Sequence, residues 1–208
     1  MARPVEKRKF IEEGVVRVVA EKGLRGTTIQ DIAEAANVSP GLLYRYWKNR
    51  DDLAGEVYRT HSLALLGQLS ILAASEPDVP SRLRVMLDAF LHYADEHPIL
   101  LKFLLLSQHD LSHNLSPEQN VHAFVRRLVQ EGMAEGSLAE MDVNVAASML
   151  LGLVLQPAIA SVYGQVSNPV REHVPAIMRA IEGALARRDS AGRQVCGSWQ
   201  VQPSSVAR

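Results

Sequence analysis

The segment over residues 27–53, TTIQDIAEAANVSPGLLYRYWKNRDDL, constrains the fold more than any other part of the chain. Thr27 or Thr28 is placed to cap a helix, and Gln30 or Asp31 three residues further on would complete a capping box. The apolar residues of this stretch recur at helical spacing on one face: Ile29, Ile32, Ala33 and Ala36. The segment therefore predicts a short helix that begins near Thr28 and packs its apolar face against other helices.

A tight turn and a second short helix are expected directly after it. Asn37 suits a turn because asparagine tolerates the left-handed backbone region. Ser39 is placed to cap the next helix, and Pro40 fits the first turn, where a missing N–H costs nothing. Leu43 is expected to point inward and lock the two helices together, and the second helix should run to about Trp47.

With Leu43 buried, this second helix presents small, aromatic and basic side chains outward. Small residues let a helix end approach base edges in a major groove, whereas hydroxyl and basic side chains reach phosphates. Arg45 is the candidate for reading a base, since its guanidinium matches the acceptors of guanine. The other basic and aromatic residues are expected to contact the phosphate backbone of DNA and so to position the helix on it. The predicted DNA-binding residues are Thr28, Gln30, Ser39, Pro40, Gly41, Leu42, Tyr44, Arg45, Tyr46, Lys48 and Arg50.

Charge is distributed unevenly along the chain. Residues 1–50 hold 10 Lys or Arg against 6 Asp or Glu, whereas residues 61–188 hold 9 against 13. A basic head on an acidic body fits a polyanionic partner for the head alone, because phosphate neutralisation needs local positive charge. The alternative is a helical enzyme or ligand carrier in which residues 27–53 are only two packed helices with a solvated basic face.

The same residues resemble the DNA-binding domain of the TetR family of transcriptional regulators. The positions that carry the resemblance are Thr27, Thr28, Ile32, Ala33, Val38, Ser39, Gly41, Leu43, Tyr44, Tyr46, Trp47, Arg50, Asp52 and Leu53. Asn37 stands where the family usually has glycine, and Trp47 replaces the usual phenylalanine. The resemblance implies a sequence-specific DNA-binding regulator, expected to be a repressor, with a helical body that dimerises and senses a small molecule.

The rest of the chain shows helical periodicity and no series of alternating strands, which predicts an all-α protein of about nine helices. The first helix is expected over Val5–Lys22, ending at Gly23. Three parts are expected: a helix-turn-helix DNA-binding domain over 1–50, a ligand-binding and dimerisation domain over 51–188, and a flexible tail over 189–208, in which Trp199 alone is a candidate for docking. The later helices are expected at about 28–36, 40–47, 50–74, 81–96, 98–109, 117–135, 142–164 and 171–188.

From Val143 to Val170 the chain contains no charged residue, which makes this stretch a transmembrane candidate by length. Its polar residues and internal proline favour a helix buried on two faces, against its own body and against a partner subunit. The resemblance implies a homodimer through the helices at about 142–164 and 171–188. A two-fold dimer sets two recognition helices about 34 Å apart, which predicts a roughly palindromic operator on double-stranded DNA.

The central helices carry more large apolar residues than one buried face needs. Plain core is the simplest interpretation of each one, but together they suggest a cavity for a small lipophilic effector, with a few polar contacts. The residues predicted to bind it are Phe90, Tyr93, Phe103, His122, Phe124, Arg126, Met149, Leu153 and Gln156.

Other functions have weaker support in the sequence. His109, Asp110 and His113, with His122 more distant, suggest a metal site, but surface histidines beside a loop explain them better. No motif supports catalysis, so we expect neither an enzyme nor a resident metal or cofactor. The N-terminus does not have the pattern of a signal peptide, and the single cysteine, Cys196, allows no intrachain disulfide, so the cytoplasm is the expected compartment.

Overall fold

The computed structural model describes residues 4–188 and residue 199. In these residues the named elements are nine α-helices and two 3-10 turns, and an isolated β-bridge joins Leu138 and Ala186. The predicted all-α fold is confirmed. The chain packs as two compact units: unit 1 contains residues 4–66 and 96–120, and unit 2 contains residues 67–95, 121–188 and 199.

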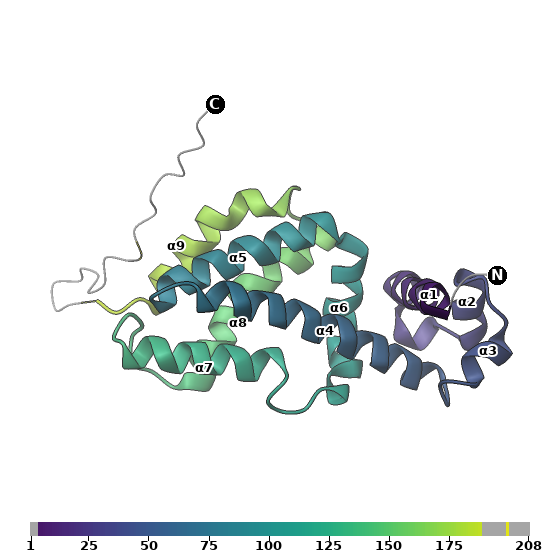
Figure 1. Cartoon of the computed structure of the whole chain (residues 1–208). Coiled ribbons are helices and arrows are strands. Elements are labelled where there is room, and N and C mark those ends of the chain that lie inside the picture. Colours follow the sequence, from purple (N-terminus) through teal and green to yellow (C-terminus); the bar gives the residue numbers. More distant parts are fainter. Residues whose placement is uncertain (1–3, 189–198, 200–208) are drawn as a thin grey trace. The chain divides into compact units, whose positions relative to one another are not determined.

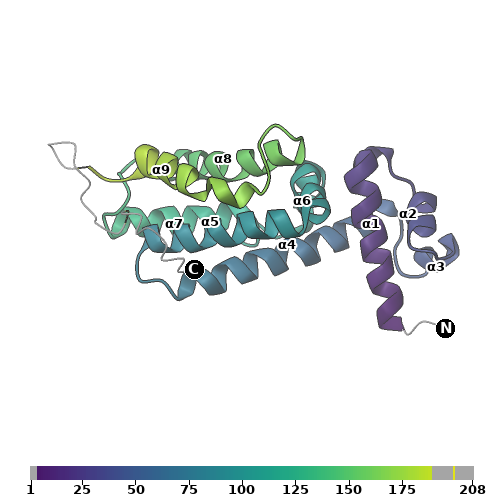
Figure 2. The same cartoon turned by 90° about the horizontal axis from the view of Figure 1, so that it is seen from above.

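Unit 1 is built around the N-terminal helices. Its elements are α1 (Pro4–Gly26), α2 (Ile29–Ala35), α3 (Pro40–Tyr44), the first part of α4 (Arg50–Ala74), α6 (Pro98–Leu111) and the 3-10 turn η1 (Ser112–Asn114). Figure 2 shows α2 and α3 together on one side of α1. Fully buried side chains from five helices fill the core, among them Val15, Ile32, Leu43, Leu53 and Phe103. The helix pair predicted from residues 27–53 is thus held by one continuous core.

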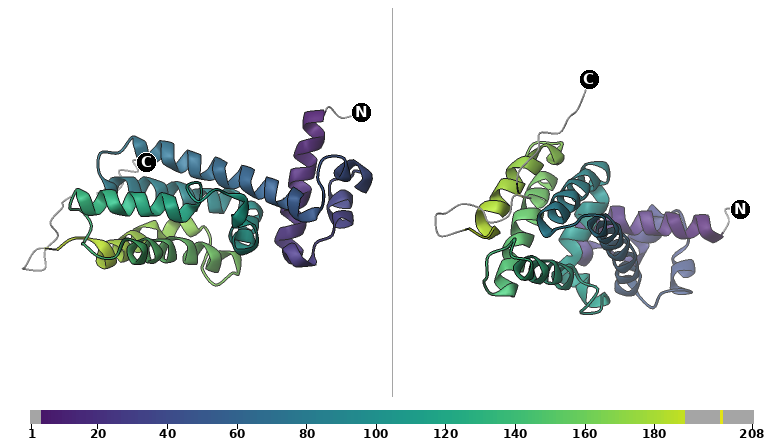
Figure 3. Two further views of the ribbon diagram at one scale, coloured as in Figure 1. Left: turned by 90° about the horizontal axis from the view of Figure 1, so that it is seen from below. Right: turned by 60° about the vertical axis from the view of Figure 1, so that its left-hand side comes forward.

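Unit 2 is a helical bundle. It contains the end of α4, nearly all of α5 (Val79–Glu96), α7 (Val121–Ala134), α8 (Val143–Val162), the 3-10 turn η2 (Val170–His173) and α9 (Val174–Leu185). Figure 1 and the two views of Figure 3 show α5, α7, α8 and α9 running beside one another. Asp95 on α5 accepts hydrogen bonds from the backbone N–H groups of Val170 and Arg171, at 2.7 and 3.0 Å. Since Asp88 also forms a two-pronged ion pair with Arg171, α5 holds the start of the last helix by charge as well as by packing.

The helix limits differ from the predictions in a few informative places. The fourth helix spans Arg50–Ala74, as predicted. The first helix passes its predicted end, because a kink at Gly23, with φ of 71°, is followed by another helical turn. The third helix is shorter than predicted and ends at Tyr44, because the N–H groups of Tyr46 and Trp47 share the Leu43 carbonyl as acceptor. The last helix starts at Val174 rather than at residue 171, because residues 170–173 form the tighter 3-10 turn.

Helix α8 is long and apolar enough by composition to span a membrane, with a mean hydropathy of 1.9. Within unit 2 it buries Ala146, Ala147, Leu150 and Leu151 against its own chain. Only 22% of its apolar window is buried, and Val145 and Met149 on the opposite face are exposed. Of the two faces of this helix that were predicted to be buried, the one facing its own body is therefore buried within the chain, and the other is exposed.

The sequence predicts a boundary at residue 50 between a DNA-binding domain and a ligand-binding domain. The two units are defined by packing and do not test whether such domains are independent, so this boundary stays a prediction. Residues 189–198 and 200–208 of the predicted tail lie outside the described residues. Trp199, the tail residue predicted as a candidate for docking, is buried with 1% of its surface exposed.

Candidate nucleic-acid interface

A capping box fixes the start of α2. The Thr28 hydroxyl accepts from the Asp31 N–H at 3.1 Å, and the Asp31 carboxylate accepts from the Thr28 N–H at 2.8 Å. Of the alternatives that the sequence left open, the pair is therefore Thr28 with Asp31. Lys22 from α1 donates to the other oxygen of Asp31 at 2.7 Å. The Lys22 hydrogen bond, with those from Thr28, lowers the pKa of Asp31 to about 2.

The turn between α2 and α3 has the predicted left-handed residue. Asn37 has φ of 53°, a value that favours glycine and that asparagine tolerates better than most residues. Pro40 occupies the first turn of α3 as predicted. The predicted side-chain cap by Ser39 is wrong: Ser39 is the N-cap residue, but its hydroxyl makes no capping bond. The Leu42 N–H, which that hydroxyl would need, instead donates to the Ser39 carbonyl at 3.0 Å.

Two buried side chains anchor α3 and the turn after it. Leu43 is fully buried, and Trp47 is 9% exposed. The indole Nε1 of Trp47 donates to Glu56 on α4 at 2.8 Å, and the other oxygen of Glu56 pairs with Arg8 on α1. The larger aromatic residue thus adds a polar link that phenylalanine would lack. This link fixes the orientation of the exposed face of α3 relative to α1 and α4 within unit 1.

Most of the predicted DNA-binding residues are exposed, on α2, on α3 or next to them in the chain. Tyr44 and Tyr46 are 54% and 68% exposed. A Cβ atom built on Gly41 would meet nothing within 4 Å, so the backbone there is open to close approach. Leu42 and Arg50 are half-buried, and the remaining predicted residues are exposed: Thr28, Gln30, Ser39, Pro40, Gly41, Tyr44, Arg45, Tyr46 and Lys48.

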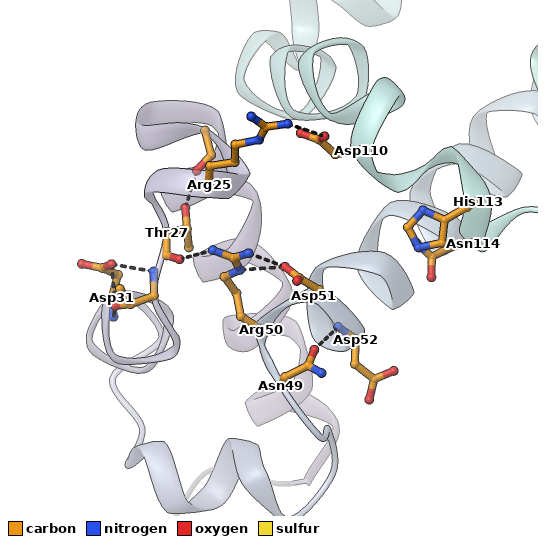
Figure 4. A network of polar contacts seen from close by, with 12 residues as sticks. Arg25, Thr27, Asp31, Asn49, Arg50, Asp51, Asp52, Asp110, His113 and Asn114 are labelled. Carbon is orange, nitrogen blue, oxygen red and sulfur yellow. Dashed lines mark hydrogen bonds and ion pairs between the residues drawn. The ribbon is translucent and has the colours of Figure 1, made fainter.

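Arg50 has a structural role that the sequence reasoning missed. Its guanidinium donates to the Thr27 carbonyl at 2.8 Å and to the Asp51 carboxylate at 2.7 and 2.6 Å (Figure 4). The Thr27 carbonyl belongs to the connection between α1 and α2, so Arg50 ties the start of α4 to that connection. Nothing in the local pattern signals this contact, because the residues lie 23 positions apart.

A side-chain N-cap by Asn49 at the start of α4 was also missed. The Asp52 N–H donates to the Asn49 side chain at 2.9 Å (Figure 4). The Lys48 N–H donates to the Asp52 carboxylate at 3.1 Å. The sequence does carry a signal for it, because Asn49 and Asp52 have the spacing of a cap and its third helical residue. These bonds fix the backbone beside Lys48.

The residues predicted to bind an effector are placed in different surroundings. Phe103 belongs to the core of unit 1, where its ring packs edge-on against Tyr58 with 6.3 Å between ring centroids. The other eight lie in unit 2. Of these, Phe90 is buried, Tyr93, Phe124 and Leu153 are half-buried, and His122, Arg126, Met149 and Gln156 are exposed. Burial raises the pKa of Tyr93. The assignment of these residues to an effector site stays a prediction.

The histidines near the end of α6 are not part of a ligand cluster in the structure. Asp110 lies 3.9 Å from the Arg25 guanidinium, and His113 contacts the Asn114 side chain (Figure 4). Within residues 4–188 and 199, no three His, Cys, Asp or Glu side chains gather as the ligands of a metal ion would.

The geometry of α2 and α3 agrees with the relatives of the chain. Residues 13–57 match the model of the bacterial regulatory proteins of the tetR family. These residues therefore form a DNA-binding domain of the tetR type. The chain is a DNA-binding transcriptional regulator, and the matched residues include α2 and α3.

Relatives of this chain are themselves named as regulators. The HTH-type transcriptional regulator YhgD of Bacillus subtilis is 23% identical over 162 residues, which cover 73% of this chain and 82% of that protein. The probable acrEF/envCD operon repressor of Escherichia coli K12 is 34% identical over 107 residues, covering 50% of this chain and 49% of that protein.

Solved structures agree on the fold. The structure of the transcriptional regulator FadR from Bacillus subtilis in complex with stearoyl-CoA is 17% identical, with a TM-score of 0.74. The match covers 83% of this chain and 96% of that one. The TetR fold therefore extends over both units of the chain.

Proposed function

We propose that this chain is a homodimeric repressor whose two α3 helices read a roughly palindromic operator, and that a small lipophilic effector releases it from DNA. The observation that carries the proposal is the exposed surface of α3 and of the turn after it, which buried Leu43 and Trp47 hold in place and which presents Arg45 between two exposed tyrosines. The repressor named among the relatives supports the direction of regulation.

The residues of the interface have separate proposed roles. Arg45 reads a guanine, because a forked guanidinium can bond both acceptors of that base in the major groove. Tyr44, Tyr46 and Lys48 contact the phosphate backbone and set the position of α3. Arg50 has donors engaged with Thr27 and Asp51, so its contribution is mainly to hold the head together, with any phosphate contact made from that fixed position.

Dimerisation through α8 and α9 is supported by the faces that unit 2 leaves uncovered. On α8 the exposed face carries Val145 and Met149 together with Gly152, which lets a partner helix approach closely. On α9 the face opposite the buried Ile177, Met178 and Ile181 carries three small exposed residues, Ala176, Ala180 and Gly183, together with the exposed Arg179. An isologous four-helix contact between two copies would cover both faces at once.

A lipophilic effector is the proposal that agrees best with the relatives and with the composition of the body. The FadR neighbour was solved with stearoyl-CoA, and two of the relatives are named KstR2 repressors. In this chain Phe90, Tyr93, Phe124 and Leu153 provide buried or half-buried apolar surface in unit 2. We propose the cytoplasm as the compartment, since that is where the operator and such regulators meet.

The test of DNA reading is an anisotropy titration with the DNA that flanks the chain's own gene, run over a range of salt concentrations. Arg45→Ala is expected to relax sequence preference, costing about 1–3 kcal/mol on the preferred site and little on others. Lys48→Ala is expected to weaken binding to all sequences and to reduce the salt slope by about 1.

Arg127→Ala is the matched control, because Arg127 is an exposed arginine on α7, outside the helix-turn-helix. It should leave affinity, preference and salt slope unchanged. If Arg45→Ala and Lys48→Ala behave alike, the division of roles is wrong. If the unaltered protein shows no preference for any flanking sequence at low salt, the proposed operator is wrong.

A further inference from the structure

Trp199 is buried in unit 2 although it lies well beyond the last helix. Only 1% of its surface is exposed, which places it among the most completely buried large side chains of the described residues. Residues 189–198 separate it in sequence from Arg188 at the end of the described helical bundle. A buried tryptophan removes about 150–250 Å² from water, so this single contact is a substantial part of the packing at that end of the bundle.

The polar groups of Trp199 have partners on two different elements. Its indole Nε1 donates to the carbonyl oxygen of Ser137 at 3.3 Å, and its own carbonyl accepts from the Arg84 guanidinium at 3.3 Å. Ser137 lies in the turn after α7 and is 2% exposed, whereas Arg84 lies on α5. A buried indole N–H needs a hydrogen-bond partner, and the Ser137 carbonyl provides one, so Trp199 is buried without an unpaired donor.

The turn that receives Trp199 also holds the end of α9. The Arg187 N–H donates to the same Ser137 carbonyl at 3.1 Å, and the Ala139 N–H donates to the Leu185 carbonyl at 2.9 Å. These two bonds flank the isolated bridge between Leu138 and Ala186. The end of α9 is thus joined to the turn after α7 by a short β-type contact. The Ser137 carbonyl, which accepts from Arg187 in this contact, also accepts from the indole of Trp199.

The start of α5 meets the same turn. The Val79 N–H donates to the Glu135 carboxylate at 2.9 Å, and the Ser137 hydroxyl donates to the same oxygen at 2.6 Å. A Cβ atom built on Gly132 would lie 2.7 Å from Leu138, so α7 and the turn are in close contact. Trp199 therefore docks where α5, α7 and α9 converge.

We propose that Trp199 is a C-terminal clamp that fixes the end of α9 against α5 and the turn after α7. Helix α9 has 12 residues, a length at which an isolated helix is marginal in water, so its position depends on tertiary anchors. The dimer part of this inference rests on the proposed function: the α8–α9 face keeps the shape that a second copy needs only while the end of α9 is held. The clamp itself concerns unit 2 alone.

The first experiment asks whether Trp199 is docked in solution. The chain contains two tryptophans, so the Trp47→Phe variant reports on Trp199 alone. Its emission is expected to be blue-shifted and poorly quenched by acrylamide, and both properties should be lost in urea. Emission and quenching equal to those of the urea-unfolded chain would overturn the proposal.

The second experiment measures what the clamp holds, by hydrogen exchange of the Arg187 and Ala139 amides. Trp199→Ala is expected to speed their exchange at least tenfold and to lower Tm by about 5–15 °C, as the loss of a buried tryptophan would. Trp199→Phe keeps most of the side-chain volume and loses one hydrogen bond. Its amide exchange rates and its Tm should therefore lie between those of the unaltered protein and of Trp199→Ala, and the variant should remain folded. Trp47→Phe is the matched control and should leave both amides unchanged.

Unchanged exchange in Trp199→Ala would overturn the clamp. Sedimentation then tests the consequence for assembly: Trp199→Ala is expected to raise the dimer dissociation constant at least tenfold, and an unchanged constant would overturn the link to assembly. If the unaltered chain is a monomer throughout, the proposed dimer fails while quenching and exchange still decide the clamp.

Discussion

Gly55 offers a sharp test of how unit 1 is packed. It is buried on α4, and a Cβ atom built there would lie 2.5 Å from Oδ1 and 2.7 Å from Cγ and Nδ2 of Asn114. Carbon atoms in favourable contact are about 3.5–4.0 Å from their neighbours, so about 1 Å of movement is required. Asn114 Nδ2 donates to the Leu111 carbonyl at 3.0 Å, which resists that movement.

The magnitude follows from three opposing effects. Replacing a glycine inside a helix with alanine stabilises by about 1 kcal/mol. Overpacking costs about 1–3 kcal/mol, and losing the Asn114 hydrogen bond costs about 0.5–1.5 kcal/mol. Gly55→Ala is therefore expected to destabilise by about 2 kcal/mol, which lowers Tm by about 4–8 °C in a chain of this size.

The sign should reverse once Asn114 is shortened. Asn114→Ala alone is expected to cost about 1 kcal/mol for the lost hydrogen bond. In that background Gly55→Ala should stabilise by about 1 kcal/mol, since only the helix effect remains, and the double variant should be close to the unaltered protein. The coupling free energy is then about 3 kcal/mol.

The assay is thermal and urea unfolding followed by far-ultraviolet circular dichroism on the four members of this cycle. Gly67→Ala is the matched control, because Gly67 is an exposed glycine of the same helix with no atom within 4 Å of a built Cβ. It should stabilise by about 1 kcal/mol in either background. An effect of Gly55→Ala that is equal in both backgrounds would refute the packing of η1 against α4.

Two further predictions concern acid stability and assembly. The pKa of Asp31 is lowered from 3.8 to about 2 by Lys22 and Thr28, so the contribution of this carboxylate to stability is present above about pH 4 and is lost as the pH falls towards 2. The free energy of unfolding measured across that range should depend less on pH in Asp31→Asn than in the unaltered protein. An unchanged pH profile would contradict the assignment. Met149→Glu places a charge on the exposed face of α8 and is expected to convert the dimer to a monomer, as measured by sedimentation. The control Arg127→Glu on α7 should leave the dimer intact. A stable Met149→Glu dimer would place the interface elsewhere.

The local structure of the DNA-binding head was predictable because neighbouring residues determine it. The Thr28–Asp31 cap, the left-handed Asn37, Pro40 in the first turn and the buried Leu43 all follow from short-range rules of helix ends and turns. The prediction that the Ser39 hydroxyl caps α3 was wrong, although it also rests on a short-range rule. The Leu42 N–H, which the hydroxyl would need as donor, instead donates to the Ser39 carbonyl.

The choice of which helices pack together needed the tertiary structure. Phe103 lies in the core of unit 1 against Tyr58, whereas the other eight residues predicted to bind an effector lie in unit 2, and no periodicity indicates this division. The contact between Arg50 and the Thr27 carbonyl likewise depends on the path of α1 and α2 between them.

The sequence by itself determined that the chain is helical, that residues 27–53 form a helix-turn-helix, and which side chains that motif turns outward, since these depend on caps, turns and a 3.6-residue period. Only the tertiary structure decided that α6 completes the core of the head and that Trp199 docks beside Ser137 and Arg84. Such contacts join residues tens of positions apart, and their free energy depends on where the whole backbone places them rather than on any local pattern.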